Sequence, residues 1–404
     1  MASLFFMAPI EEGKRKNVTS NNHNSNVLEK PELIIDCQGL INRNDGELLK
    51  VKKLQSLNKK YSLSLSEGEI SSSIASNSCP EFVTSRNYPS SASNSDFPLA
   101  YSLVLHKNPG QAERLLRAIY SPDNVYCLHI DAKTPEVIFK DFEALSSCFP
   151  NVFLAQKRKN VYWASYERLQ ADFNCMQELL EHEIQWRYLI NLCGEDFPLK
   201  RNSEIVSYLK SVYPKNSIET FPMTVSWNLK KKIRYEKHWE LHKYETESEY
   251  KFHPMMTDKD KSPPPGGIEI FSGIAYNFFT REFIQWALED KDVRELIEWS
   301  KDTFSPDEFI WATIIRMKNA PGNEFIGKST ENLSRLILWQ NNVKDHECQG
   351  YFRRNVCVFG SGDVGWLLRT PYFFANKFDA VDDFALQCLE EELRKEPEIK
   401  EDHD

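Results

Sequence analysis

Residues 97–131, FPLAYSLVLHKNPGQAERLLRAIYSPDNVYCLHID, carry the pattern that decides the fold. FPLAYSLVLH (97–106) is typical of a buried strand, and QAERLLRAIY (111–120) is typical of an amphipathic helix. NVYCLHID (124–131) has the character of a second strand. A strand, a helix and a strand in this order favour a mostly parallel sheet that is covered by helices.

The same alternation continues along the chain. Two further helical patterns and two further strand patterns follow, the helices at 135–149 and 166–182 and the strands at 151–156 and 187–199. The sequence therefore predicts an α/β fold with a helix-covered mixed sheet. Ligands of such sheets bind beyond the carboxyl ends of the strands. His106, Asp131 and the pair Glu195-Asp196 stand at these ends.

The chain divides by composition near Phe97. Residues 1–97 are rich in Ser, Asn, Lys and Glu, and few apolar positions recur with a period. This composition predicts a partly disordered stem or linker, followed by one catalytic domain over 98–404. Within that domain, 221–267 is polar, basic and then proline-rich, so we expect a long excursion over the surface there.

Charge and cysteine content narrow the class of protein. The net charge of -9 argues against a nucleic-acid partner, whose binding surface would be basic. The nine cysteines form no C-x-x-C pair, so they are either scattered thiols of a cytosolic enzyme or mostly disulfides of a secretory one. Sequons at Asn17 and Asn332 favour the secretory alternative and predict N-glycosylation there.

The N-terminus shows no membrane span. The apolar run in MASLFFMAPI is far shorter than the roughly 20 residues that cross a bilayer. It also lacks the basic start and the cleavage site of a signal peptide. If the protein is secretory, we expect its targeting segment to be missing here or unusual.

SPDEFIWAT (305–313) is the densest motif. As structure, it predicts a capping box in which Ser305 is the N-cap and Glu308 occupies N3, with Phe304 and Phe309 as a hydrophobic staple. As chemistry, a carboxylate at a helix N-terminus stays ionised and can act as a general base. The two roles are compatible.

Other motifs have simpler explanations. GSGDVG (360–365) matches a dinucleotide-binding pattern, but fewer than 40 residues follow it, and no strand with an acidic residue is evident there. The D-x-D tripeptides at 258–260 and 290–292 resemble metal-binding motifs of nucleotide-sugar transferases. They lie in a Lys-rich loop and at a helix end, so we interpret them as solvated surface.

If no metal is bound, cations of the protein must neutralise a leaving diphosphate. Arg353, Arg354 and Lys377 stand among apolar and aromatic residues near the C-terminus. The alternative is that they are ordinary surface cations with buried stems.

Five motifs together resemble a known family. They are NLCGEDFPLK, IFSGIAY followed by TREF, SPDEFIWAT, RNVCVFGSGDVGWLL and FANKFD, in order and at the family's spacing. The chain resembles the core-2/I-branching β-1,6-N-acetylglucosaminyltransferases (glycosyltransferase family 14) over about 97–395. The resemblance implies a GT-A-like fold, inversion at the anomeric carbon and no metal ion or other cofactor.

The resemblance also implies roles for particular residues. Glu308 matches the general base, which takes the proton from the acceptor 6-hydroxyl. Donor UDP-GlcNAc is bound by the residues that match Val104, Leu105, His106, Asp131, Ala132, Lys133, Trp163, Arg354 and Lys377. Acceptor sugar is bound by the residues that match Glu219, Lys231, Arg234 and Trp339. Arg354 and Lys377 match two cations that grip the diphosphate.

The family's cysteine pattern implies the disulfides Cys37–Cys388, Cys79–Cys148, Cys127–Cys175 and Cys348–Cys357, with Cys193 free. The sequence also departs from the family. Trp163 and Asn341 stand where the family has tyrosines, and Lys231 and Arg234 align only loosely. The family's Golgi membrane anchor is not visible either. Most of these departures lie on the acceptor side.

We therefore expect a metal-independent, inverting enzyme of the Golgi lumen. It would move GlcNAc from UDP-GlcNAc in β-1,6 linkage to GalNAc or Gal of glycoprotein O-glycans. Two alternatives stay open from the sequence: a UDP-sugar-binding homologue with weak or no catalysis, and a xylosyltransferase-like enzyme. Comparing UDP-Xyl with UDP-GlcNAc as donor distinguishes the second.

Overall fold

The structure is a computed structural model, and it describes residues 35–57, 64–91, 96–224, 231–245, 250–325, 332–341, 346–379 and 383–395. The Asn17 sequon and the first 34 residues of the predicted stem lie outside the described residues.

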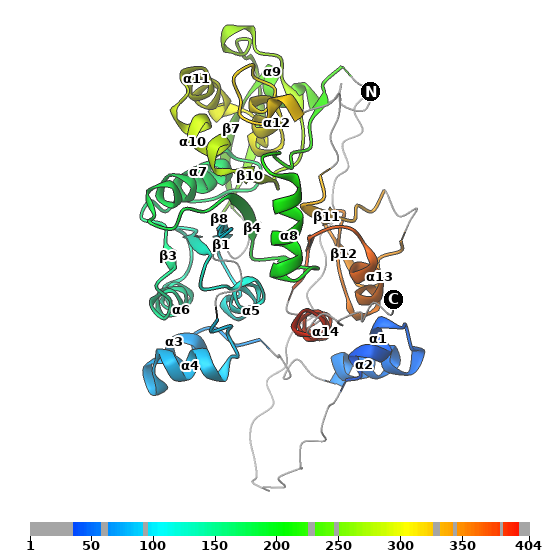
Figure 1. The fold of residues 1–404 in the computed structure, drawn as a ribbon. Helices are drawn as coiled ribbons and strands as arrows, with labels where there is room; N and C mark the ends of the chain where they lie inside the picture. The colour runs from blue at the N-terminus through cyan, green and yellow to red at the C-terminus, as the bar shows by residue number, and fades with distance from the viewer. Residues whose placement is uncertain are drawn as a thin grey trace, which may run out of the picture. The chain divides into compact units, whose positions relative to one another are not determined.

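A five-stranded sheet forms the centre of the fold (Figure 1). Its strands, in spatial order, are β10 (Phe278–Thr280), β4 (Tyr188–Cys193), β1 (Leu99–Leu105), β2 (Val125–Ile130) and β3 (Val152–Leu154). Strands β4, β1, β2 and β3 run parallel, and β10 is antiparallel to β4. The prediction of a mixed, mostly parallel sheet is confirmed.

Helices cover both faces of this sheet. They follow the strands as predicted: α5 (Pro109–Ile119) after β1, α6 (Glu136–Ser147) after β2 and α7 (Tyr166–Glu181) after β3. Leu103 of β1 packs in a core cluster with Leu115 of α5, whereas Ala100 belongs to a second cluster with Leu169 of α7. Alternate residues of β1 thus face opposite helix layers, as the two-residue period of a strand requires.

Four helices precede the sheet. They are α1 (Cys37–Ile41), α2 (Asp45–Leu57), α3 (Glu69–Asn77) and α4 (Cys79–Ser85). Asp141 of α6 accepts hydrogen bonds from Gly68 N and Ser71 Oγ at the start of α3. The described part of the predicted stem is therefore helical and packed on the sheet domain, while the boundary at residue 97 stays a prediction.

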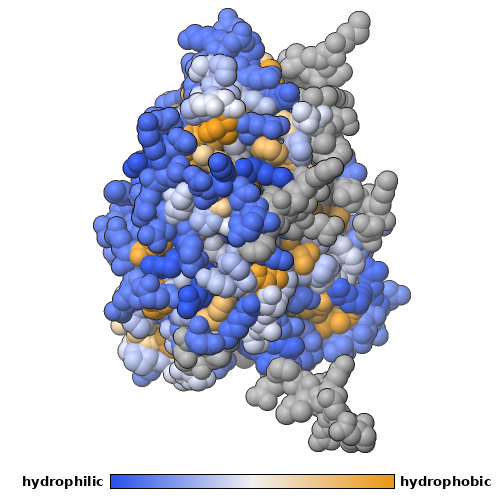
Figure 2. All heavy atoms as spheres, turned by 45° about the horizontal axis from the view of Figure 1, so that its top comes forward, coloured by the Kyte–Doolittle hydropathy of each residue, from blue (hydrophilic) through white to orange (hydrophobic). Residues whose placement is uncertain are grey.

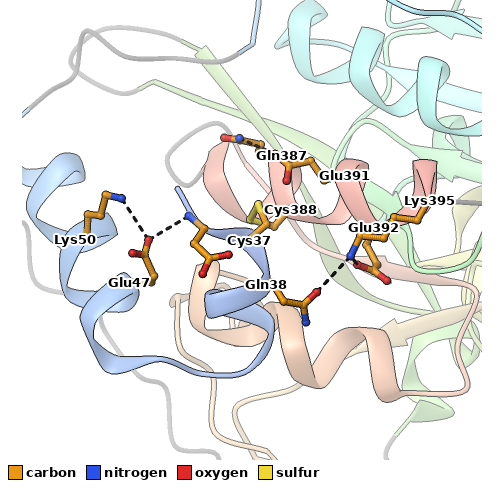
Figure 3. Close-up of a disulfide and its surroundings, with 10 residues drawn as sticks. Cys37, Gln38, Glu47, Lys50, Gln387, Cys388, Glu391, Glu392 and Lys395 are labelled. Carbon is orange, nitrogen blue, oxygen red and sulfur yellow. Dashed lines mark hydrogen bonds and ion pairs between the residues drawn. A yellow bond between two sulfur atoms is a disulfide. The ribbon is translucent and has the colours of Figure 1, made fainter. Parts of the chain in front are cut away.

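Disulfides attach these helices to the rest of the fold. Cys37 of α1 is bonded to Cys388 of α14 (Asp383–Arg394), and Gln38 and Lys395 add a hydrogen bond beside it (Figure 3). The other disulfides are Cys79–Cys148, Cys127–Cys175 and Cys348–Cys357, and Cys193 is a free cysteine. This pairing is the one that the resemblance implies.

Small sheets complete the C-terminal side. One joins β11 (Arg335–Ile337), β14 (Phe374–Asn376) and β5 (Asp196–Pro198). Because β5 follows β4 after only two residues, this sheet continues directly from the carboxyl end of β4. A hairpin of β12 (Tyr351–Arg353) and β13 (Val356–Val358) precedes η6 (Ser361–Asp363) and α13 (Val364–Arg369).

The segment 221–267 contains an element that the sequence pattern did not predict. After α8 (Asn202–Val212), β6 (Phe221–Pro222) and α9 (Ile233–Glu236), the chain forms a long hairpin of β7 (Lys237–Glu245) and β8 (Tyr250–Asp260). Its strands are rich in charged residues and do not alternate cleanly, so the usual strand signal is weak.

The remaining elements complete the side of the sheet next to β10. They are η2 (Pro265–Gly267), β9 (Phe271–Ser272), α10 (Arg281–Glu289), α11 (Lys291–Trp299), η3 (Ser300–Asp302), η4 (Pro306–Glu308), α12 (Ile310–Ile314) and η5 (Asn323–Phe325). In the part of the chain that the structure describes, no helix has both the length and the apolar character of a membrane span. The face seen in Figure 2 is mainly hydrophilic, with small separate hydrophobic patches.

Candidate active site

A cavity of about 790 Å³ opens at the carboxyl ends of the central strands. It is lined by the ends of β1, β2 and β4 and by the segments around residues 161–164, 304–308 and 354–356. This is the position at which parallel α/β sheets bind ligands. Site residues predicted from several separate motifs therefore line the same cavity.

The predicted donor residues line one wall of the cavity. Val104, Leu105 and His106 come from the end of β1, and Asp131 and Lys133 follow β2. Lys133 Nζ lies 2.7 Å from Asp131 Oδ2 and donates to the Val161 carbonyl, also at 2.7 Å. Burial, and then the charge of Lys107, lower the pKa of His106.

Trp163 and Ala132, two other residues predicted to bind the donor sugar nucleotide, differ from this group in exposure and contacts. Trp163 lines the cavity with 59% of its surface exposed, and its ring meets the Phe304 ring edge-on at 5.4 Å. Ala132 is not among the lining residues, and its backbone N–H donates to the Lys159 carbonyl at 2.9 Å. A role of Ala132 would therefore run through the turn that it shares with Asp131.

The predicted diphosphate cations lie on another part of the cavity wall. Arg354 and Asn355 form the turn of the β12–β13 hairpin with φ of 52° and 63°. A two-residue turn with both φ values positive matches the twist of a hairpin, and asparagine tolerates it well. Among the described residues, the Arg354 guanidinium takes part in no hydrogen bond or ion pair.

Lys377 follows β14 and lies 3.7 Å from Glu195 Oε2. Glu195 also pairs with Lys107 and Arg353, each at 2.8 Å. Burial by itself raises the pKa of Glu195, but Lys107, Lys377 and Arg353 outweigh it, so the pKa is lowered. One partly buried carboxylate thus pairs with three cations, of which Lys377 lines the cavity.

Glu308 ends the short 3-10 helix η4, and its carboxylate forms an ion pair with Arg234. Both residues line the cavity, and the Glu308 side chain is 38% exposed. The predicted capping box is wrong. Ser305 has φ of 49° and its side chain makes no cap hydrogen bond, because the left-handed backbone replaces the extended N-cap conformation.

The remaining acceptor candidates are Glu219, Lys231 and Trp339. Lys231 Nζ donates to Ser272 Oγ at 2.9 Å. Burial raises the pKa of Glu219, the Lys231 charge opposes the rise and the Glu308 charge adds to it. Trp339 lines the cavity and is 48% exposed. Glu219 and Lys231 are not lining residues, and the Glu308 charge acts on the pKa of both.

Several lining residues escaped the sequence analysis. They are Arg168, Cys193, Tyr276, Asp307 and Asn376. Asp307 precedes Glu308 and stands in the strongest motif, so its position was a usable signal. Arg168 stands inside an amphipathic helix pattern, where a cation looks like any solvated residue.

Other motifs lie away from the cavity. Neither D-x-D tripeptide is among the lining residues. Asp260 pairs with Lys237 on the long hairpin, and Asp290 caps α11. In GSGDVG, both oxygens of Asp363 accept backbone hydrogen bonds, from Gly360 and Gln349, which is a structural role.

The prediction of a glycan at Asn332 is not supported. Asn332 is 7% exposed, and its Nδ2 donates to the Tyr276 carbonyl at 2.8 Å. Its Oδ1 accepts from Ser217 Oγ and Ser334 N. A glycan on this nitrogen would disrupt a buried hydrogen-bond network.

Comparison with known proteins adds to this geometry. A family model described as Core-2/I-Branching enzyme matches residues 99–368. The chain is 40% identical over 386 residues to the β-1,3-galactosyl-O-glycosyl-glycoprotein β-1,6-N-acetylglucosaminyltransferase 3 of Rattus norvegicus, covering 91% of this chain and 85% of the relative. It is 40% identical over 332 residues to the human protein of the same name, covering 78% of this chain and 73% of the relative. A transferase of Bovine herpesvirus 4, with the corresponding unnumbered name, is 42% identical over 332 residues with the same coverage.

Proposed function

This chain belongs to the Core-2/I-branching enzyme family, and from that premise we propose that it transfers GlcNAc from UDP-GlcNAc to a glycoprotein O-glycan. It is an enzyme of the β-1,6-N-acetylglucosaminyltransferase type. The relatives are named for acceptors that carry a β-1,3-linked galactose on an O-glycan. We therefore propose a glycoprotein bearing Galβ1-3GalNAc as the acceptor.

The observation that carries this proposal is the meeting of Glu308, Arg354 and Lys377 in one cavity. Inverting transfer needs one base and a means of stabilising the leaving nucleotide. Glu308 supplies a carboxylate, and Arg354 and Lys377 supply the positive charge. Their source elements, η4, the β12–β13 turn and the end of β14, are far apart in sequence.

The proposed reaction is a single displacement. The acceptor 6-hydroxyl oxygen attacks C1 of GlcNAc, and its proton passes to the Glu308 carboxylate. The bond between C1 and the β-phosphate oxygen breaks, and its electron pair leaves with UDP, so the configuration at C1 inverts. Arg354 and Lys377 stabilise the charge that develops on the diphosphate in place of a divalent metal ion.

Arg234 has a positioning role in this scheme. Its ion pair with Glu308 fixes the direction of the carboxylate, and its guanidinium lies over the Phe304 ring at 5.4 Å. Four disulfides require an oxidising compartment, and we propose the lumen of the Golgi apparatus.

The test is transfer of radiolabelled GlcNAc from UDP-GlcNAc to a Galβ1-3GalNAc glycoside in EDTA. Wild type should remain active, and Glu308→Gln should lose about 10²–10⁴-fold in rate, the usual contribution of a general base. Glu324→Gln, an exposed acid in η5, is the matched control. Loss of wild-type transfer in EDTA would contradict metal independence, and undiminished transfer by Glu308→Gln would remove the proposed base.

A further inference from the structure

The cavity contains two charged residues that the proposed reaction does not use. Asp307 lies in η4 directly before Glu308, and Arg168 lies in the first turn of α7. Both line the cavity. Cys193 and Tyr276, whose side chains are ordinarily uncharged, line the cavity as well.

Hydrogen bonds connect Arg168 through Asp172 to the central sheet. Its Nη1 donates to Asp172 Oδ2 at 2.6 Å, and its side chain is 14% exposed. Asp172 in turn accepts from Ser102 Oγ of β1 at 3.0 Å. The guanidinium is therefore fixed in direction, which is what a binding group needs for selective recognition.

Both residues have hydrogen-bonding capacity that the protein leaves unused. In the part of the chain that the structure describes, Arg168 Nη2 and Asp307 Oδ1 are shielded from solvent and have no hydrogen-bond partner. No ion pair joins the two residues within that part either. Among the cavity-lining residues they are the two with such buried unpaired atoms.

A polar atom that is shielded from solvent and lacks a hydrogen-bond partner is rarely kept in a fold without a use. Burial raises the pKa of Asp307 to about 6, and the neighbouring Glu308 charge adds to the rise while Arg168 opposes it. Burial also raises the pKa of Cys193 to about 12, so this thiol brings no charge that could pair with Arg168. Asp307 thus offers a hydrogen-bond acceptor and Arg168 a hydrogen-bond donor beside Glu308.

We propose that Asp307 and Arg168 form the subsite that binds the transferred sugar and selects it among UDP-sugars. Sugar hydroxyls donate to the Asp307 carboxylate and accept from the Arg168 guanidinium, in the charge-assisted geometry that both groups favour. This inference rests on the proposed function. In that reaction the sugar must lie between Glu308 and the diphosphate cations, and Asp307 adjoins Glu308.

The experiment measures binding of UDP and of UDP-GlcNAc separately, by calorimetry on the whole chain. Asp307→Asn keeps the size of the side chain but removes its charge. We expect its Kd for UDP to stay within twofold of wild type and its Kd for UDP-GlcNAc to rise at least tenfold. Asp292→Asn, an exposed acid on α11, should change neither constant.

Arg168→Lys provides a second variant, because it keeps a cation beside Asp172 but removes the Nη2 group that is proposed to contact the sugar. It should show the same selective loss, and both variants should lower the preference of the enzyme for UDP-GlcNAc over UDP-glucose. Equal weakening of UDP and UDP-GlcNAc, or no change in either, overturns the subsite. Failure of wild type to bind UDP at all would instead count against the proposed function.

Discussion

Arg353 and Arg354 are neighbours in sequence and differ in every contact. Arg353 pairs with Glu195 at 2.8 Å and with Asp379 at 3.0 Å. Arg354 lies one step further, in the left-handed turn, and its guanidinium lines the cavity. Arg353 therefore connects β12 to Glu195 and Asp379, whereas Arg354 is available to bind an anion.

This difference predicts opposite results for two matched variants. Arg354→Ala should weaken UDP binding by roughly 10–100-fold, since a hydrogen bond to a charged group contributes about 1.5–3 kcal/mol. Its unfolding free energy should change little. Arg353→Ala should lower the unfolding free energy by about 1–3 kcal/mol, because Glu195 and Asp379 lose a partner. Calorimetry and denaturant unfolding measure the two effects, and equal UDP affinities of the two variants would contradict the assignment.

The raised pKa of Asp307 predicts that its contribution to the free energy of unfolding falls as pH rises. Its pKa is raised in the fold to about 6, chiefly by burial. Its contribution to stability is therefore fully present at acid pH and is lost as pH rises through about 6. The charged groups facing it are Glu308, Arg168 and Asp172.

Asp307→Asn should accordingly raise the unfolding free energy at pH 7.5, by about 1–3 kcal/mol, because it removes a buried charge. The gain should shrink at pH 5, where wild-type Asp307 is itself mostly neutral. Thermal unfolding at the two pH values checks this. A variant less stable than wild type at both values would indicate a structural role for the carboxylate.

At the scale of elements, the position of η4 depends on a close backbone contact. Gly273 N donates to the Glu308 carbonyl at 2.8 Å. A Cβ at Gly273 would lie 2.2 Å from the Glu219 carbonyl oxygen and 2.9 Å from Ala312 Cβ. Glycine at this position lets the chain after β9 approach both Glu308, the proposed base, and Glu219, an acceptor candidate.

Gly273→Ala should therefore displace η4 and β6 and lower transfer at least tenfold, while UDP binding changes less. Gly46→Ala is the control, because it lies in α2 and its added methyl would meet only the end of the Asn44 side chain. Steady-state kinetics and UDP titration distinguish the two. A wild-type transfer rate for Gly273→Ala would contradict this prediction, because it would show that η4 and β6 can shift without loss of activity.

At the scale of the whole molecule, disulfides close loops of very different length. Cys37–Cys388 joins residues 351 apart, whereas Cys348–Cys357 joins residues 9 apart. In the chain-entropy model, the stabilisation grows with the logarithm of loop length. The long-range bond connects the N-terminal helices to α14 and so restricts almost the entire described chain.

Replacing both cysteines of each pair by serine tests this. The model gives the 37–388 bond about twice the stabilisation of the 348–357 bond, a difference of about 3 kcal/mol. Denaturant unfolding of the two double variants measures it. A greater loss for the short loop would mean that local packing around β13 outweighs chain entropy.

The sequence by itself determined the strand and helix order, the sheet type and the place of the site at the strand ends. These depend on periodicities and caps that a few neighbouring residues set. The resemblance added the proposed base, the proposed diphosphate cations and the cysteine pairs. Local patterns failed at Ser305, whose left-handed backbone replaces the expected cap, and in the charged strands of the long hairpin.

Only the tertiary structure decided which side chains meet. Glu308 and Arg234 stand 74 residues apart, and nothing near either of them in sequence indicates the ion pair. Packing likewise buried Asn332, separated the roles of Arg353 and Arg354, and brought Arg168 and Asp307 to one cavity wall. Such contacts depend on how helices and strands pack across the whole chain, which no window of neighbouring residues contains.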